Sequence, residues 1–257
     1  MSLLSIEDHP GSVRLLTLDR APVNAFNLDL MVAVSDAFRE VEATPEIRAV
    51  VITGSGPVFS AGLDFKAMMN VRAEGLEAAE HFARTMHQAF FDIWTCTCPT
   101  VAAVNGSSIA AGYLVGAACD FRIVAEGPGE HGLNEIQFGG GFPAIAVEIG
   151  RSVMGPRIIQ SLLSGELFDW KGGVDNGSFT SSETPDALLV KALDTARQLG
   201  EFPQPAYAHA KAQLLAPFTE RVMAETEEQK RTTDAIFASE ETLASLMKYM
   251  QSVLKKS

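Results

Sequence analysis

Short, predominantly apolar segments that end in glycine constrain the fold of this 257-residue chain more than any other feature. "IRAVVITG" (47–54) and "PTVAAVNG" (99–106) have the length and composition of strands that are buried on both faces. Other segments, such as residues 24–43, place apolar residues at helical spacing instead. Because doubly buried strands alternate here with helices, the sequence predicts an α/β fold whose sheet is covered on both sides.

Further elements follow the same pattern. We expect strands at "SVRLLTLD" (12–19) and "CDFRIVAE" (119–126), and a buried helix at "AAGYLVGAAC" (110–119). From about residue 145 onward the pattern is helical, apart from a glycine- and serine-rich surface connection at 166–186 that carries one short strand. We find no interdomain linker. The prediction is a catalytic core over residues 1–195 and a helical C-terminal section, 196–257, that packs on it and contributes to oligomerisation.

Composition excludes several classes of protein. The net charge is −12 and the basic residues are scattered, which argues against a nucleic-acid surface or a membrane-binding basic patch. No apolar run has the length of a membrane span, and the N-terminus lacks a secretory pattern, so we expect a cytoplasmic protein. Cys96 and Cys98 resemble half of a metal site, but no second pair exists. We therefore predict buried reduced thiols and no metal.

The first stretch that could carry chemistry is "PVFSAGLDF" (57–65), which follows an apolar strand. Its small residues, Ala61 and Gly62, would let a ligand approach the backbone closely. A helix that begins near Asp64 would leave free N–H groups in its first turn. The alternative is a tight turn between strand and helix, with Asp64 serving only as the helix cap.

The second stretch is "NGSSIAAGYLVGAACD" (105–120), where a strand again ends at glycine and small residues begin a helix. Ala110, Ala111 and Gly112 leave no large side chain over the backbone amides. Two such turns in one core could present two N–H groups to one atom, which is the geometry of an oxyanion hole. Close packing of a buried helix explains the same spacing equally well.

The third stretch, "GLNEIQFGGGFPA" (132–144), contains a single acid, Glu135. Its nearest basic neighbours in the sequence are His131 and Arg151. A carboxyl group in apolar surroundings has a raised pKa, which makes it a better proton acceptor near neutrality. Alternatively, Glu135 lies exposed on a turn or caps a neighbouring helix.

Together the three stretches, in this order and spacing, resemble the enoyl-CoA hydratase/isomerase (crotonase) superfamily. The resemblance runs from "VRLLTLDRAPVNAFN" to "LLSGELFD" (13–169) and is strongest to the Δ3,Δ2-enoyl-CoA isomerases of fatty-acid metabolism. It implies an α/β crotonase-like spiral of ββα units with a helical C-terminal section. It also implies an acyl-CoA thioester substrate, no cofactor beyond that substrate, and a homotrimer or dimer of trimers.

The resemblance also assigns residues. By motif position the oxyanion-hole N–H groups belong to Leu63 and Ala111, and the catalytic acid-base is Glu135. The family usually has glycine where Ala111 stands. The positions that the resemblance assigns to substrate or CoA binding are Asn24, Ala25, Ala61, Gly62, Asp64, Phe65, Gly112, Leu114, Asn134 and Phe237.

One departure from the family pattern bears on the reaction. Hydratases of the family carry two glutamates that hold and activate water, and the first of these positions is Leu114 here. The remaining carboxylate, Glu135, can still move a proton between C2 and C4 of an enoyl chain, and Leu114 would exclude water. The resemblance therefore implies isomerisation of 3-enoyl-CoA to 2-enoyl-CoA. A hydratase, another crotonase-type acyl-CoA enzyme and a non-catalytic acyl-CoA-binding paralogue remain as alternatives.

Overall fold

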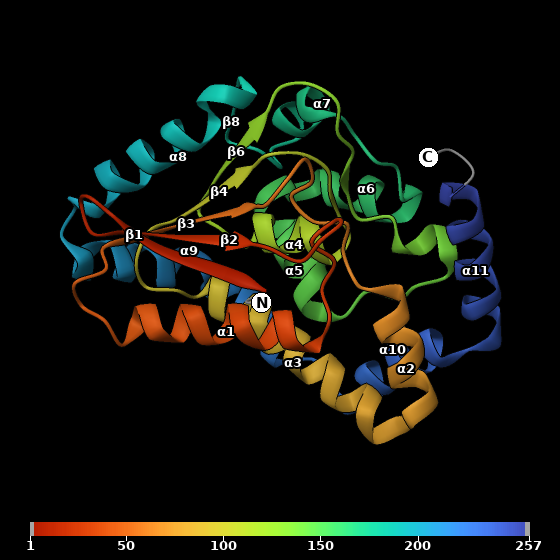
Figure 1. Ribbon diagram of the computed structural model, residues 1–257. Coiled ribbons are helices and arrows are strands. Elements are labelled where there is room, and N and C mark those ends of the chain that lie inside the picture. The colour runs from red at the N-terminus through yellow and green to blue at the C-terminus, as the bar shows by residue number, and fades with distance from the viewer. Residues whose placement is uncertain (1–2, 255–257) are drawn as a thin grey trace.

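A six-stranded sheet forms the centre of the molecule in a computed structural model that describes residues 3–254 (Figure 1). The strand order is β1-β2-β3-β4-β6-β8. The first two strands pair antiparallel and all later neighbours pair parallel. The strands are β1 (Leu4–His9), β2 (Val13–Leu18), β3 (Ala49–Gly54), β4 (Thr100–Val104), β6 (Phe121–Ala125) and β8 (Ser181–Glu183).

The two central strands are covered on both faces, as their apolar sequences predict. Along β3, Val50 and Ile52 belong to the large core cluster, whereas the alternate residue Val51 belongs to a second, smaller cluster. The large cluster includes buried residues of α1 (Leu28–Glu42) and α3 (Leu76–Trp94). The smaller cluster is closed by α8 (Pro185–Gly200), which crosses the other face in Figure 1. Because successive side chains of a strand point to opposite faces of the sheet, β3 contributes residues to two separate cores.

A second, two-stranded sheet connects the regions that carry the motifs. Parallel strands β5 (Ser108–Ile109) and β7 (His131–Gly132) form it. Helix α4 (Ala111–Ala117) follows β5 directly, and each of its residues is buried, as the sequence predicts. The 3₁₀ turn η1 (Glu135–Phe138) follows β7 after two residues. The α/β fold with a sheet covered on both faces, which the sequence predicts, is confirmed.

The chain beyond η1 is mainly helical. At one end of the molecule in Figure 1, α10 and α11 lie near α2 (Phe65–Glu74), far from the outer strand β8. None of the helices in residues 3–254 is long and apolar enough to cross a membrane. The remaining elements are α5 (Ala144–Met154), η2 (Gly155–Arg157), α6 (Ile158–Ser164), α7 (Trp170–Asp175), α9 (Gln204–Met223), α10 (Glu227–Ala238) and α11 (Glu240–Leu254).

Two features differ from the sequence prediction. Strand β1 was not predicted, because its polar residues 7–9 hide the pattern of an outer strand. Residues 166–186 are more than a surface connection: they contain helix α7, and the short strand predicted there, β8, extends the main sheet beside β6. Ser178 and Phe179 in this stretch are buried, which periodicity in so short a segment could not show.

Candidate active site

The first turn, at residues 60–64, leaves one backbone donor unused. Phe26 forms a parallel bridge with Leu63, through bonds from Phe26 N to the Gly62 carbonyl (2.7 Å) and from Asp64 N to the Phe26 carbonyl (2.9 Å). The N–H of Leu63 itself donates to no acceptor within residues 3–254. This donor is therefore available to a ligand.

Asp64 caps the helix that follows, and α2 begins at Phe65 as the sequence predicts. Its side chain accepts a 2.9 Å hydrogen bond from Ala67 N and pairs with the Arg20 guanidinium. Burial raises the pKa of the Asp64 carboxyl, but these two partners outweigh burial and hold that pKa below its usual range. Asp64 thus acts as the cap that fixes the turn beside Leu63, and any contact with substrate stays a prediction.

The second turn, at residues 109–112, also leaves one backbone N–H group unused within the described residues. Ala110 N donates to the Gly132 carbonyl (2.9 Å), and Leu114 N donates to the Ala110 carbonyl (3.1 Å). The N–H of Ala111, between these bonds, has no acceptor in the described part of the chain. Ala110 adopts φ of +54° and ψ of −125°, a conformation that alanine rarely takes and that costs energy.

The two turns lie in direct backbone contact. Ile109 N donates to the Ser60 carbonyl at 3.1 Å. A Cβ atom on Gly62 would lie 2.8 Å from the Ile109 carbonyl oxygen and 3.5 Å from the Ala111 nitrogen, and one on Gly112 would lie 2.4 Å from the Ser60 carbonyl oxygen. Only glycine allows this approach. Two unused donors in adjoining turns can together stabilise a developing oxyanion.

Glu135, the first residue of η1, has a buried carboxyl group although the turn around it is exposed. Its Oε2 atom is buried and forms no hydrogen bond with any described residue. Burial raises the pKa of the Glu135 carboxyl to about 7, against a smaller lowering by the N–H groups of Glu135 and Asn134. The carboxyl group is thus neither exposed nor a helix cap, and its pKa suits proton transfer near neutrality.

A buried side-chain pair joins β5, which leads into the second turn, to β7, which precedes the Glu135 turn η1. Ser108 Oγ and His131 Nδ1 lie 2.8 Å apart, and both residues are about 1% exposed. Burial lowers the pKa of His131 to about 4, so the imidazole is neutral near pH 7. Ser108 is three residues before Ala111, and His131 is four residues before Glu135. Nothing in the sequence indicated this pair, because its members are 23 residues apart.

Leu114 lies on α4, three residues after Ala111, so both residues project from the same side of the helix. The leucine is 3% exposed and belongs to the large core cluster. Its side chain has no atom that could hold water or move a proton.

Asn24 and Ala25 support the first turn from the loop before α1. The Asn24 amide group donates to three backbone carbonyls, those of Ser55, Val58 and Phe59, at 2.8 to 3.2 Å. The Ala25 carbonyl accepts from Arg20 Nη1 at 2.9 Å. The Asn24 side chain is therefore occupied in holding the loop, and substrate contact by either residue stays a prediction.

Asn134 and Phe237 make contacts that involve the C-terminal helices. Asn134 is buried, and its amide donates to the Tyr249 hydroxyl on α11 at 2.7 Å. Phe237 is half-buried on α10, and its carbonyl accepts from Arg72 Nη1 on α2 at 3.3 Å. Tyr249 had no signal in the sequence, because more than a hundred residues separate it from its partner.

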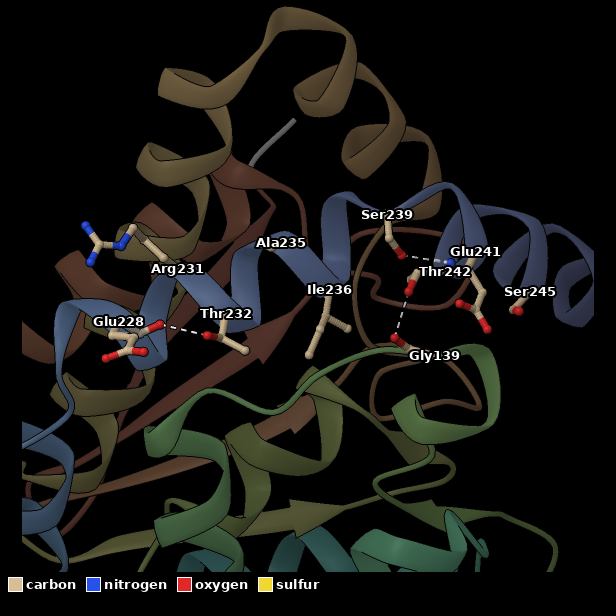
Figure 2. A pocket seen from close by; sticks show the side chains of 10 residues that line it. All are labelled: Gly139, Glu228, Arg231, Thr232, Ala235, Ile236, Ser239, Glu241, Thr242 and Ser245. Carbon is tan, nitrogen blue, oxygen red and sulfur yellow. Dashed lines mark hydrogen bonds between the residues drawn. The ribbon is translucent and has the colours of Figure 1, made fainter.

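A groove of about 730 Å³ lies between α10, α11 and the loop that follows η1 (Figure 2). Arg231 and Glu228 flank one end, and Thr242 donates to the Gly139 carbonyl at the other. Its lining includes neither Glu135 nor the Leu63 and Ala111 turns. The groove is therefore a separate feature of the surface next to the Glu135 turn.

The cysteines match the sequence prediction of buried thiols. Cys96, Cys98 and Cys119 are free and buried, and the Sγ atoms of the first two lie 3.5 Å apart. No group of three or more histidine, cysteine, aspartate or glutamate residues suited to a metal ion occurs among the described residues.

An α/β core that presents two unused backbone donors and a buried carboxylic acid defines a crotonase-type protein. The family model for enoyl-CoA hydratase/isomerase matches residues 8–253, and the chain belongs to this family. The family that the motifs indicated is thus confirmed, and the protein is an enzyme of the enoyl-CoA hydratase/isomerase class.

Solved structures and curated relatives are similar to almost the whole chain. The human mitochondrial Δ3-Δ2-enoyl-CoA isomerase superimposes with a TM-score of 0.92 at 22% identity, over 100% of both chains. An enoyl-CoA hydratase/isomerase from Xanthobacter autotrophicus Py2 gives 0.84 at 27% identity, over 95% of this chain and 91% of the other. A probable enoyl-CoA hydratase of Rhizobium meliloti is 27% identical over 237 residues, which cover 90% of this chain and 88% of the relative. The probable enoyl-CoA hydratase EchA17 of Mycobacterium bovis is 30% identical over 224 residues, which cover 84% of this chain and 83% of the relative.

Proposed function

We propose that this protein isomerises 3-enoyl-CoA thioesters to 2-enoyl-CoA, with Glu135 as the only proton carrier. The observation that carries the proposal is the Glu135 carboxyl group, whose Oε2 atom is buried without a hydrogen-bond partner in the described chain. Burial raises its pKa to about 7. At neutral pH such a group exists in both forms, so it can accept a proton and return it.

The chemistry follows from the charge that forms. Glu135 removes the proton from C2 of the 3-enoyl chain, which makes an enolate at the thioester, and then delivers the same proton to C4. The N–H groups of Leu63 and Ala111 would donate to the enolate oxygen, each contributing on the order of 3 kcal/mol to the transition state. The reaction needs no cofactor beyond the acyl-CoA substrate.

Leu114 supports isomerisation over hydration. Addition of water across a double bond needs groups that hold and activate that water. The Leu114 side chain is apolar and buried on the same side of α4 as the Ala111 turn. It therefore excludes water where the hydratases of the family have a glutamate.

Hydration of 2-enoyl-CoA is the second candidate, and the names of the relatives favour it. The proteins from Rhizobium meliloti and Mycobacterium bovis are both named probable enoyl-CoA hydratases. The two activities are separated by measuring isomerisation of 3-hexenoyl-CoA and hydration of 2-hexenoyl-CoA with the same preparation. We expect isomerisation to be much faster, and comparable rates would contradict the single-carboxylate mechanism.

Glu135→Gln tests the proton carrier. The substitution keeps the shape of the side chain and removes the base, so single-turnover isomerisation should fall by about 100- to 10,000-fold while acyl-CoA affinity changes little. Glu130→Gln, at an exposed position five residues earlier, is the matched control and should keep full activity. Near-normal turnover by Glu135→Gln would show that another group carries the proton.

Leu114→Glu tests water exclusion. We expect this variant to gain hydration activity, whereas Leu114→Gln, of similar size but without an acid, should not. Equal hydration by both variants would show that polarity alone, and not a second carboxylate, limits the wild-type protein.

We also propose that the protein assembles as a homotrimer or a dimer of trimers. Two apolar side chains on α6, Ile159 and Leu163, are 57% and 69% exposed in the single chain, which supports burial in an assembly. Sedimentation equilibrium measures the mass directly, and a monomer at micromolar concentration would contradict the proposal.

A further inference from the structure

The turn that carries Glu135 is too short to hold itself in place. η1 spans only four residues, and 3₁₀ hydrogen bonds are weaker than those of an α-helix. Ile136 and Gln137 of this turn are exposed. A side chain that moves a proton between two carbon atoms must nevertheless be held to a fraction of an ångström. The rigidity has to come from elements packed against the turn.

Helix α11 contacts the turn on both sides of Glu135. Before Glu135, the Tyr249 hydroxyl accepts a 2.7 Å hydrogen bond from the Asn134 amide, and after it the Tyr249 ring packs against Phe138 with centroids 5.3 Å apart. Also after Glu135, Thr242 Oγ1 donates to the Gly139 carbonyl at 2.8 Å, a bond that Figure 2 shows. Tyr249 and Thr242 are two turns apart on the helix, so together they span η1.

The same helix is also tied to the other half of the site. Ser239, at the junction of α10 and α11, caps α11 by accepting a 3.1 Å bond from Thr242 N. Beside this junction, Arg72 of α2 donates to the Phe237 carbonyl and pairs with Glu240 at 3.0 Å. Because α2 begins directly after the Leu63 turn, α10 and α11 connect the oxyanion side of the site to the base side.

We propose that α11 is a clamp that positions Glu135, with Tyr249 and Thr242 as positioning residues for its proton transfer. The proposal rests on the proposed role of Glu135 as the base. Neither residue touches the substrate in this account. Tyr249 acts through the side chains of Asn134 and Phe138, and Thr242 acts through the Gly139 carbonyl. Loss of either contact would let the turn move and admit water to the Glu135 carboxyl group.

The informative variants are Tyr249→Phe and Thr242→Val, alone and combined. Tyr249→Phe keeps the ring that packs against Phe138 and removes the hydroxyl that accepts from the buried Asn134 amide. Thr242→Val keeps the shape and removes the donor to Gly139. Thr232→Val is the matched control, because Thr232 Oγ1 donates to a carbonyl in the same groove, that of Glu228, but within α10 (2.8 Å; Figure 2).

Three measurements are made on the full-length protein. For each clamp variant we expect kcat of isomerisation to fall by about 10-fold, and for the double variant by about 100-fold, with KM nearly unchanged. Hydrogen exchange of the amides at 137–140 should become faster. The pKa of the Glu135 carboxyl, followed by ¹³C NMR and assigned by loss of its signal in Glu135→Gln, should fall toward its ordinary range. Thr232→Val should change none of the three.

The outcomes separate this proposal from the function on which it rests. A wild-type protein without isomerase activity would overturn the proposed function, and the exchange and NMR data would still decide whether α11 holds the turn. An active wild type whose clamp variants keep full kcat overturns the clamp, even if exchange becomes faster, because the contacts would then only hold α11. Reduced kcat with unchanged KM, faster exchange and a lower Glu135 pKa supports it.

Discussion

The two halves of the candidate site are built in different ways. On the oxyanion side, Leu63 and Ala111 contribute backbone N–H groups from two turns that lock together through glycine, next to a fully buried helix. On the base side, Glu135 contributes a side chain from a short turn with exposed neighbours, held by a distant helix. In the proposed mechanism, charge stabilisation therefore depends on close backbone packing and involves no group that titrates. The proposed proton transfer depends instead on one titratable group and on contacts between residues far apart in the sequence.

Apart from Glu135→Gln, the largest expected effect comes from breaking the oxyanion side at Gly112. In Gly112→Ala the new Cβ would lie 2.4 Å from the Ser60 carbonyl oxygen, so the two turns must separate. We expect isomerisation to fall by at least about 100-fold, the usual cost of losing one oxyanion donor. Gly116→Ala on the same helix is the control, because its Cβ would lie 3.6 Å from the nearest atom, an ordinary contact. Full activity in Gly112→Ala would show that contact between the turns is not required.

The next largest effect is expected from a change of pH, which should act on the base side through Glu135 and leave the oxyanion side unaffected. Because the Glu135 carboxyl must be ionised to accept a proton, kcat/KM, which reports on the free enzyme, should rise with pH and level off above a pKa of about 7. Folding has the opposite sign: a pKa raised from 4.5 to about 7 means that the folded state binds more protons, so stability falls as pH rises between these values. The full cost above pH 7 is about 3 kcal/mol.

Glu135→Gln removes the free-energy cost of ionising the buried carboxyl group, so it tests whether stability falls as pH rises. In urea unfolding, the stability of this variant relative to wild type should increase from pH 4.5 to pH 8. A difference that stays constant across this range would mean that the Glu135 carboxyl is not the group with the raised pKa.

The Ser108–His131 pair lies between the oxyanion side and the base side of the candidate site. A double-mutant cycle measures its contribution to the free energy of unfolding. Ser108→Ala and His131→Phe each leave one buried polar group unpaired and should each cost about 1 to 3 kcal/mol of stability. The double variant leaves neither group unpaired, so its cost should be clearly smaller than the sum. Additive costs would show that the 2.8 Å contact contributes nothing to the coupling.

The smallest effect is expected at Ala110, whose φ of +54° strains the second turn. Ala110→Gly relieves this strain but adds freedom to the unfolded chain, so the stability gain should be at most about 1 kcal/mol. Thermal unfolding measures the gain, and activity should stay within about two-fold of wild type. A loss of stability would mean that the alanine methyl contributes packing that outweighs the strain.

Most of the fold could be predicted from local pattern. The segments 47–54 and 99–106 had to be central strands, because a short run that is apolar on both faces must be covered on both faces. Asp64 marked the start of α2, since a carboxylate after small residues satisfies free N–H groups. Strand β1 and the pairing of β8 escaped prediction because short, polar outer strands are specified by their neighbours in the sheet.

The sequence by itself determined which chemical groups are present: two turns able to offer backbone donors, one acid in an apolar stretch, and leucine at position 114. Tertiary structure alone decided what these groups can do. It buried the Glu135 carboxyl, which the stretch taken alone would sooner place on an exposed turn, and it placed Tyr249 against Asn134 across more than a hundred residues. The physical reason is that periodicity records whether a residue is buried, whereas the pKa of an acid depends on what buries it.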